Sequence, residues 1–316
     1  MRLPSLRLLC ALMSILDLSV PRLAAQQSPT PAIQVKRDLA YASGGPEFTL
    51  DIAYPAEPAT PHPLLVYVPA NDYGIDFSYS NTLHWKGNYT DLILQEAAAK
   101  GYVAAAINHR RADILFLKGS AYPLGALVDD IRSALAWLAA HAADYGIDPA
   151  RIAVLGNSSG GHLALAASYG MPGESMTAWT AAPGFPAIKA VVCSSGVPDD
   201  VAFMAEYLTN PAAFQVTPYP YIVSMLRDLY GGDYPERRAA YEAGTPIRFV
   251  RPACPPTFLL HGGLDKSLDP KYAVALDEAL SKAGVRHSLR IFPHAAHRSF
   301  LLENEVWDFL SAELKP

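Results

Sequence analysis

The chain has 316 residues, of which 51% are hydrophobic and 17% are charged, and its formal net charge is -5. This balance supplies enough apolar side chains for one large core and excludes an intrinsically disordered chain. No long basic or acidic run gives an electrostatic reason to expect a nucleic acid or an anionic membrane as partner.

The N-terminus has the pattern of an export signal. Two arginines precede an apolar run at residues 8–16, and small residues follow at 24–25. Asp17 interrupts the apolar stretch, which is shorter than the ~20 residues of a membrane-spanning helix. We therefore expect a signal peptide over residues 1–25 and a secreted or periplasmic protein.

Apolar runs bounded by turn residues predict eight β-strands. The first two flank Ser43-Gly44-Gly45-Pro46, and the second alternates apolar and polar residues, which predicts a hairpin with one solvated face. The other six runs are mostly apolar and do not alternate, as expected of parallel strands covered on both faces. The predicted strands span residues 35–41, 48–54, 64–68, 102–107, 152–155, 188–193, 257–260 and 289–292.

Apolar residues that recur every three to four positions predict helices between these strands. The clearest are 127–142 before Gly146, 272–283 before Gly284, and a last helix over 300–314. This order predicts an α/β fold with an eight-stranded, mostly parallel sheet covered by helices on both faces.

Residues 26–316 are assigned to one catalytic domain. Within it, the stretch 197–251 fits no simple alternation of strand and helix, and we predict a small cap-like insertion there. Cys193 ends one predicted strand and Cys254 precedes the next, so the two lie at opposite edges of a parallel sheet. A disulfide needs Cα atoms within about 7 Å, and we expect none.

The motif Gly156-Asn157-Ser158-Ser159-Gly160 stands between the fifth predicted strand and a helical run. A Gly-x-Ser-x-Gly motif at such a turn strains the backbone and lifts the serine oxygen to the top of the sheet. By itself the five-residue pattern often occurs as a flexible turn, and its placement is what indicates a nucleophile. We predict that Ser158 is the catalytic nucleophile.

A serine needs a base to take its proton, and the acid that orients the base should follow a later strand. Asp265 follows the strand predicted at 257–260 directly. Asp269 is a competitor, but it stands immediately before a proline and a helix and has the position of an N-cap. We predict that Asp265 is the acid.

The base is expected in the loop after the last strand. His294 and His297 both lie there, and His297 has more loop with which to reach Ser158. A lone loop histidine is usually a solvated surface residue, but this one stands where the other two residues require a base. We predict the triad Ser158, Asp265 and His297.

Further motifs occur in order along most of the chain after residue 25. They are Ile107-Asn108-His109-Arg110, Asp129-Asp130-Ile131-Arg132, Tyr145-Gly146-Ile147-Asp148-Pro149, Gly160-Gly161-His162-Leu163-Ala164, and Pro255-Pro256-Thr257-Phe258-Leu259-Leu260-His261-Gly262. With the serine motif, these segments resemble the hormone-sensitive-lipase-like and carbohydrate-esterase branch of the α/β-hydrolases. The resemblance implies an α/β-hydrolase fold and the hydrolysis of carboxylic esters.

The stretch after the third strand departs from that family. The family usually has His-Gly-Gly-Gly there, whose backbone N–H groups bind the oxyanion together with the N–H after the nucleophile. Here it reads Pro69-Ala70-Asn71-Asp72-Tyr73-Gly74. Backbone donors do not require glycine, so Ala70 and Asn71 are the candidate oxyanion donors beside Ser159. Either the Asn71 side-chain amide also donates, or Asn71 and Asp72 only shape the turn.

Two further features bear on the substrate. Arg298 either offers a cation to the substrate or is solvated, with Ser299 as a helix N-cap. The insertion is rich in aromatic residues, which either line a pocket for an acyl, aryl or sugar group or form core beneath the cap. These aromatic residues are Phe203, Tyr207, Phe214, Tyr219, Tyr221 and Tyr230.

The sequence thus predicts a serine carboxylesterase that acts through an acyl-enzyme on short-chain or carbohydrate-linked acetyl or feruloyl esters. The expected partner is a small-molecule or carbohydrate ester, with no nucleic acid and no membrane. Without a metal-binding motif such as HExxH, we expect no cofactor and no metal. The alternatives are an exopeptidase or amidase with the same triad, and a non-catalytic binding protein for which the altered loop is the only support.

Overall fold

The computed structural model describes residues 32–56, 60–74, 88–214 and 219–314. In these ranges eight strands form one sheet in the order β1-β2-β4-β3-β5-β6-β7-β8. The predicted signal peptide over residues 1–25 lies outside the described residues. The strands are β1 (Ile33–Ala40), β2 (Thr49–Pro55), β3 (His62–Val68), β4 (Val103–Ile107), β5 (Ile147–Asn157), β6 (Ile188–Ser194), β7 (Thr257–Gly262) and β8 (His287–Phe292).

The sheet is mostly parallel, as predicted. β2 pairs antiparallel with β1 and with β4, and every later neighbour pair is parallel. The prediction that β2 has one solvated face is wrong, because all seven of its residues are buried. β2 lies between β1 and β4 and is covered on both faces, whereas most residues of the edge strand β1 are exposed.

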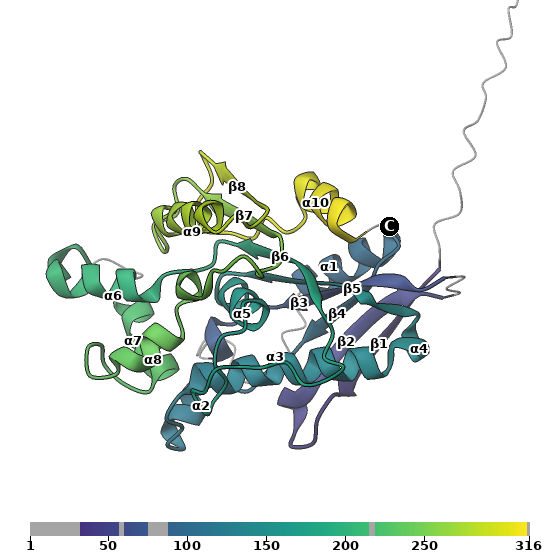
Figure 1. Ribbon diagram of the computed structural model, residues 1–316, viewed down its shortest axis with the longest axis horizontal. Helices are drawn as coiled ribbons and strands as arrows, with labels where there is room; N and C mark the ends of the chain where they lie inside the picture. Colours follow the sequence, from purple (N-terminus) through teal and green to yellow (C-terminus); the bar gives the residue numbers. More distant parts are fainter. Residues whose placement is uncertain (1–31, 57–59, 75–87, 215–218, 315–316) are drawn as a thin grey trace, which may run out of the picture. The chain divides into compact units, whose positions relative to one another are not determined.

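Helices connect the strands and cover the sheet (Figure 1). The α-helices of the described ranges are α1 (Asn88–Ala99), α2 (Ala112–Leu117), α3 (Pro123–Ala140), α4 (Ala142–Tyr145), α5 (Ser159–Ser168), α6 (Asp200–Thr209), α7 (Tyr219–Tyr230), α8 (Arg238–Ala243), α9 (Lys271–Lys282) and α10 (Asn304–Leu314). Short 3-10 turns are η1 (Pro46–Phe48), η2 (Asp72–Gly74), η3 (Pro211–Phe214) and η4 (Pro246–Phe249). The predicted insertion at residues 197–251 contains α6, α7 and α8, which gather at one end of the sheet.

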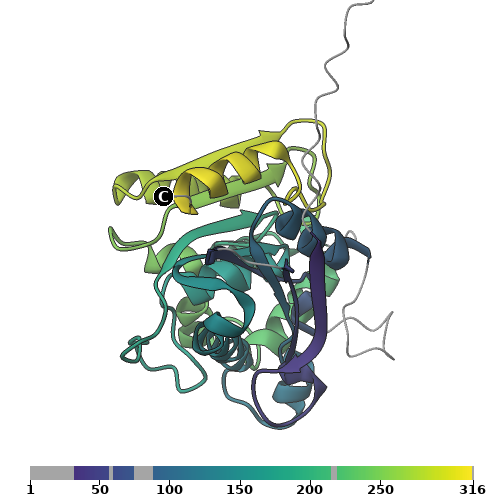
Figure 2. The same ribbon diagram turned by 90° about the vertical axis from the view of Figure 1, so that its right-hand side faces the viewer.

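The core has two parts, one on each face of the sheet. Helices lie on both sides of the sheet (Figures 1 and 2). In β3, Leu64 and Val66 pack into the cluster shared with α3, α5 and α9, whereas Leu65 and Tyr67 pack into the cluster shared with α1 and α10. This burial on both faces explains why the strand is continuously apolar.

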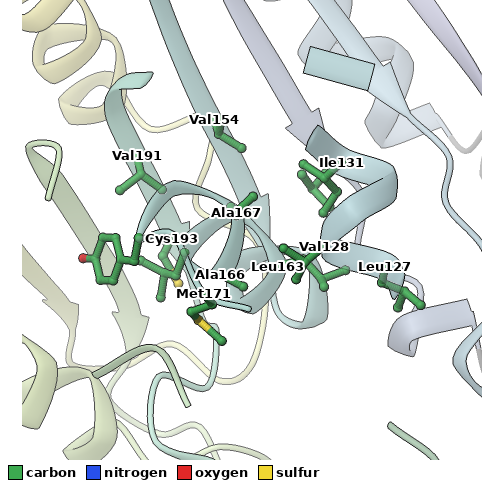
Figure 3. Packing of buried hydrophobic residues seen from close by; sticks show 14 of the residues in the cluster. Leu127, Val128, Ile131, Val154, Leu163, Ala166, Ala167, Met171, Val191 and Cys193 are labelled. Carbon is green, nitrogen blue, oxygen red and sulfur yellow. The ribbon is translucent and has the colours of Figure 1, made fainter. Parts of the chain in front are cut away.

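Helix α5 packs between the central strands and α3 (Figure 3). Leu163 and Ala167 of this helix lie among Val154 of β5, Val191 of β6 and Ile131 of α3, and all five are buried. The first residue of α5 follows Ser158, so this packing fixes the serine relative to the sheet.

The last helix begins later than predicted. Phe300 and Leu301 precede α10 and are both 1% exposed. They are apolar because they pack into the cluster beneath α10, and the helix itself starts at Asn304.

Cys193 and Cys254 are both free, as predicted. Over the described part of the chain, no helix is both long and apolar enough to cross a membrane.

Candidate active site

The turn that carries Ser158 requires glycine on both sides. Ser158 lies between β5 and α5 with φ 52° and ψ −122°, a conformation that costs a non-glycine residue about 1–3 kcal/mol. A Cβ atom on Gly156 would lie 2.0 Å from the Gly160 carbonyl oxygen, and one on Gly160 would lie 2.1 Å from the Val68 carbonyl oxygen. The two glycines therefore let the end of β3 and the start of α5 approach the strained serine.

The structure brings Ser158, Asp265 and His297 together. His297 Nδ1 lies 2.7 Å from Asp265 Oδ2, and His297 Nε2 lies 3.1 Å from Ser158 Oγ. A carboxylate can only accept a hydrogen bond, so Nδ1 carries the proton and Nε2 is free to accept from the serine hydroxyl. His294, the other candidate, is exposed.

Asp265 is held as an anion by several donors. Its Oδ1 accepts from the backbone N–H groups of Ser267 (2.8 Å) and Leu268 (2.9 Å). Its Oδ2 accepts from His297 and also faces His261 Nε2 at 3.1 Å. Burial would raise the pKa of this carboxyl, but the hydrogen bonds from His261 and His297 lower its pKa below the ordinary range.

No role was predicted for His261 from the sequence. It lies in β7, is 1% exposed, and its Nε2 also contacts the Leu268 carbonyl oxygen at 2.8 Å. The available signal was its spacing of four residues before Asp265. The competing acid, Asp269, instead accepts from the backbone N–H of Lys271 at the start of α9.

The loop after β3 reaches the N-terminus of α5. The Asn71 backbone N–H donates to Ser159 Oγ at 3.2 Å. Ser159 is the first residue of α5, where a backbone N–H has no partner within its helix. The Asn71 side-chain oxygen is buried and has no hydrogen-bond partner among the described residues.

A buried polar cluster lies beside this loop, and none of its members was singled out as a site residue. The Tyr73 hydroxyl lies 2.6 Å from His162 Nδ1, and the Tyr230 hydroxyl donates to Asp200 Oδ2, which is 3.7 Å from the same imidazole nitrogen. Each of the four side chains is at most 1% exposed. Burial lowers the pKa of His162 to about 4, and burial with the nearby Asp199 carboxylate raises the pKa of Asp200 to about 8.

The raised pKa of Asp200 makes stability depend on pH. From the unfolded pKa near 4 up to the folded pKa of about 8, the folded protein retains a proton that the unfolded chain has lost, so stability falls as pH rises. Asp200→Asn keeps an acceptor for Tyr230 and removes this titration. We expect the variant to gain on the wild type by roughly 1 kcal/mol per pH unit between pH 5 and 8. Urea unfolding of both proteins at several pH values measures this difference. Free energies of unfolding that change with pH in the same way in both proteins would contradict it.

A cavity of about 180 Å³ opens above Ser158. Its walls are mainly apolar, and the cap supplies much of them through Val197 and α7. The Tyr221 hydroxyl donates to Asp72 Oδ2 at 3.0 Å, so the cap contacts the β3 loop at the cavity. The lining residues are Asp72, Tyr73, Ser158, Ser159, Val197, Tyr221, Ile222, Met225, Ser267, Leu268 and His297.

The aromatic residues of the insertion divide between the two predicted roles. Tyr221 lines the cavity, whereas Phe203 and Tyr230 are buried in the core. The side chains of Phe214 and Tyr219 lie outside the described residues.

Arg298 is solvated, as one of the two interpretations had it. Its side chain is 56% exposed, and its guanidinium pairs with Glu303 at 3.2 Å. Ser299 is not the N-cap of α10, because that helix begins at Asn304 and the Ser299 hydroxyl accepts from Tyr89 instead.

The sheet order, the strained serine turn and the covering helices define an α/β-hydrolase fold. The chain belongs to the BD-FAE family, whose model matches residues 50–280. Esterase LipQ of Mycobacterium tuberculosis is 27% identical over 288 residues, which cover 86% of this chain and 61% of that protein. The chain therefore spans less than two thirds of this relative.

Solved esterase structures share the fold. The truncated form of a carbohydrate esterase from gut microbiota superposes with a TM-score of 0.67 at 21% identity, covering 91% of this chain and 98% of the other. Esterase B from Lactobacillus rhamnosis superposes with a TM-score of 0.68 at 17% identity, covering 90% and 86%.

Proposed function

We propose that this protein is a serine carboxylesterase that cleaves short-chain or carbohydrate-linked acetyl or feruloyl esters through an acyl-enzyme. The observation that carries the proposal is the position of the His297 imidazole, 3.1 Å from Ser158 Oγ and 2.7 Å from Asp265 Oδ2. The relatives named as esterases support the same chemistry.

In the first half-reaction, Ser158 Oγ attacks the ester carbonyl carbon and its proton passes to His297 Nε2. Asp265 keeps the other ring proton on Nδ1 and stabilises the imidazolium. The tetrahedral intermediate then collapses, and the departing alcohol takes the proton from Nε2. In the second half-reaction, water gives a proton to Nε2 and attacks the acyl group, which releases the carboxylic acid and restores Ser158.

The carbonyl oxygen becomes negatively charged in both tetrahedral intermediates. We assign its binding to the backbone N–H groups of Ser159 and of the loop after β3, where Asn71 is favoured over Ala70 because the Asn71 N–H reaches Ser159 Oγ beside the nucleophile. The oxyanion would replace Ser159 Oγ as the acceptor for Asn71. One such donor contributes about 100- to 1000-fold in turnover.

The cavity favours a small acyl group. Its volume of about 180 Å³ lies below the 300–1,000 Å³ typical of sites for drug-sized ligands. Its apolar walls, which include Val197, Ile222 and Leu268, favour each buried methylene by about 0.8 kcal/mol until the space is filled.

The test is hydrolysis of p-nitrophenyl esters from acetyl to palmitoyl, with Ser158→Ala as the blank. We expect kcat/KM to rise by up to about fourfold per methylene for the shortest chains, to peak by about butyryl, and to fall for longer chains. Activity that kept rising past octanoyl would refute the short-chain assignment. Turnover of an aminoacyl anilide with little ester hydrolysis would favour an amidase.

Export is part of the same proposal. It rests on the sequence pattern of residues 1–25. The N-terminal sequence of the protein recovered from a bacterial periplasm or culture medium is expected to begin at Gln26, and retention of full-length chain in the cytoplasm would refute it.

A further inference from the structure

We propose that Tyr73 is a positioning residue for the oxyanion site: its buried hydroxyl, hydrogen-bonded to His162, fixes the Asn71 backbone N–H beside the first turn of α5. This inference rests on the proposed function. It explains how a loop without consecutive glycines holds a strained backbone next to the nucleophile.

The loop is strained where a glycine is expected. Asp72 has φ 47° and Tyr73 has φ 58°, so two consecutive non-glycine residues adopt the left-handed conformation. This conformation costs about 1–2 kcal/mol per residue and persists only where surrounding contacts impose it. The Asn71 N–H comes directly before this pair of residues, so its direction depends on the contacts that hold them.

Tyr73 supplies one of those contacts, and it is buried. Its side chain is 1% exposed, its hydroxyl lies 2.6 Å from His162 Nδ1, and the two rings meet edge to face with centroids 5.7 Å apart. His162 is the fourth residue of α5, the helix that begins at Ser159. The contact therefore ties the loop to the same helix that carries the other proposed oxyanion donor.

The direction of this hydrogen bond follows from the second nitrogen of His162. Nε2 lies 2.8 Å from the Gly244 carbonyl oxygen, which can only accept, so Nε2 carries the proton. Nδ1 is therefore an acceptor, and the Tyr73 hydroxyl donates to it. Burial keeps His162 neutral and raises the pKa of Tyr73, so neither partner of the bond changes its protonation over the pH range of an esterase assay. Asp200, 3.7 Å from the same nitrogen, is the neighbouring group whose raised pKa of about 8 falls within that range.

Tyr73→Phe tests the proposal with Tyr169→Phe as its matched control. Tyr169 is also fully buried, its hydroxyl lies 2.9 Å from Thr257 Oγ1, and it follows the C-terminal end of α5. For p-nitrophenyl acetate, Tyr73→Phe is expected to lower kcat at least tenfold with little change in KM. The midpoint of the pH dependence of kcat is expected to stay unchanged. The control is expected to stay within twofold of the wild type in kcat.

A transition-state analogue separates positioning from general damage. A short-chain trifluoromethyl ketone forms a tetrahedral adduct with serine, and its oxygen occupies the oxyanion site. In Tyr73→Phe its Ki is expected to rise by the same factor by which kcat/KM falls. A kcat within twofold of the wild type, or an equal loss in both tyrosine variants, would overturn the proposal.

Amide hydrogen exchange provides a readout that needs no turnover. Exchange of the Asn71 and Asp72 amides is expected to accelerate at least tenfold in Tyr73→Phe and not in Tyr169→Phe. Unchanged exchange would overturn the positioning role even if the enzyme is active. An inactive wild type with the expected exchange change would instead refute the proposed function and leave the role of Tyr73 in holding the loop intact.

Discussion

Ser158→Ala is expected to lower kcat for p-nitrophenyl butyrate by about 10⁶-fold, the scale seen when a triad serine is removed from a hydrolase. The Ser158 hydroxyl lies 3.1 Å from His297 Nε2, which makes it the oxygen that can give its proton to the imidazole. Labelling by a fluorophosphonate probe should disappear in the same variant. Residual labelling would place the nucleophile elsewhere.

The matched control is Ser168→Ala at the other end of α5. The Ser168 hydroxyl is buried with no hydrogen-bond partner among the described residues, so its removal should leave kcat within twofold and stability unchanged or raised. A second comparison tests the strain at the serine turn. Because Ser158 has φ 52° and ψ −122°, the free energy of unfolding measured with urea should be about 1 kcal/mol higher for Ser158→Gly than for Ser158→Ala.

Much of the fold could be predicted from the sequence because the relevant signals are local. The mostly apolar runs marked the parallel strands, since burial on both faces favours apolar residues along a strand such as β3. The expected burial on both faces is wrong for β8, an edge strand in which exposed and partly buried residues alternate. The alternation in β2 misled because burial depends on which strands lie beside it, and β2 is inside the sheet. Phe300 and Leu301 extended the apparent periodicity of α10 for a similar reason: they are core residues that precede the helix.

The residues of the candidate site also differ in whether their positions follow from local sequence signals. Ser158, Asp265 and His297 could be placed from the sequence because each stands in a loop directly after a predicted strand. Tyr73, His162 and His261 could not, because their contacts join segments whose approach is set only by packing; Tyr73 and His162 are 89 residues apart in the chain. A buried tyrosine and a core histidine have no distinctive pattern in a sequence, and their roles follow only from which nitrogen faces which oxygen.

Asp265→Asn is expected to reduce kcat by about 10⁴-fold while leaving the fold intact. The Asn carbonyl oxygen can take the place of Oδ1, which accepts from the backbone N–H groups of Ser267 and Leu268. The Asn NH₂ group then faces His297 Nδ1 and donates to it, while the His261 Nε2–H, which faced the same oxygen at 3.1 Å, keeps the Leu268 carbonyl oxygen as its acceptor. This moves the imidazole proton to Nε2, which can no longer accept the proton of the serine.

The tautomer of His297 can be read directly from its ¹⁵N chemical shifts, so the cause of the lost activity is measurable apart from the rate. Asp269→Asn is the control, because Asp269 lies in the same loop, is 47% exposed and keeps its acceptor for the Lys271 N–H after the substitution. We expect kcat within twofold for that variant. A large loss in Asp269→Asn with a mild one in Asp265→Asn would exchange the two assignments, and an unchanged His297 tautomer in Asp265→Asn would mean that Asp265 supports the imidazole by charge alone.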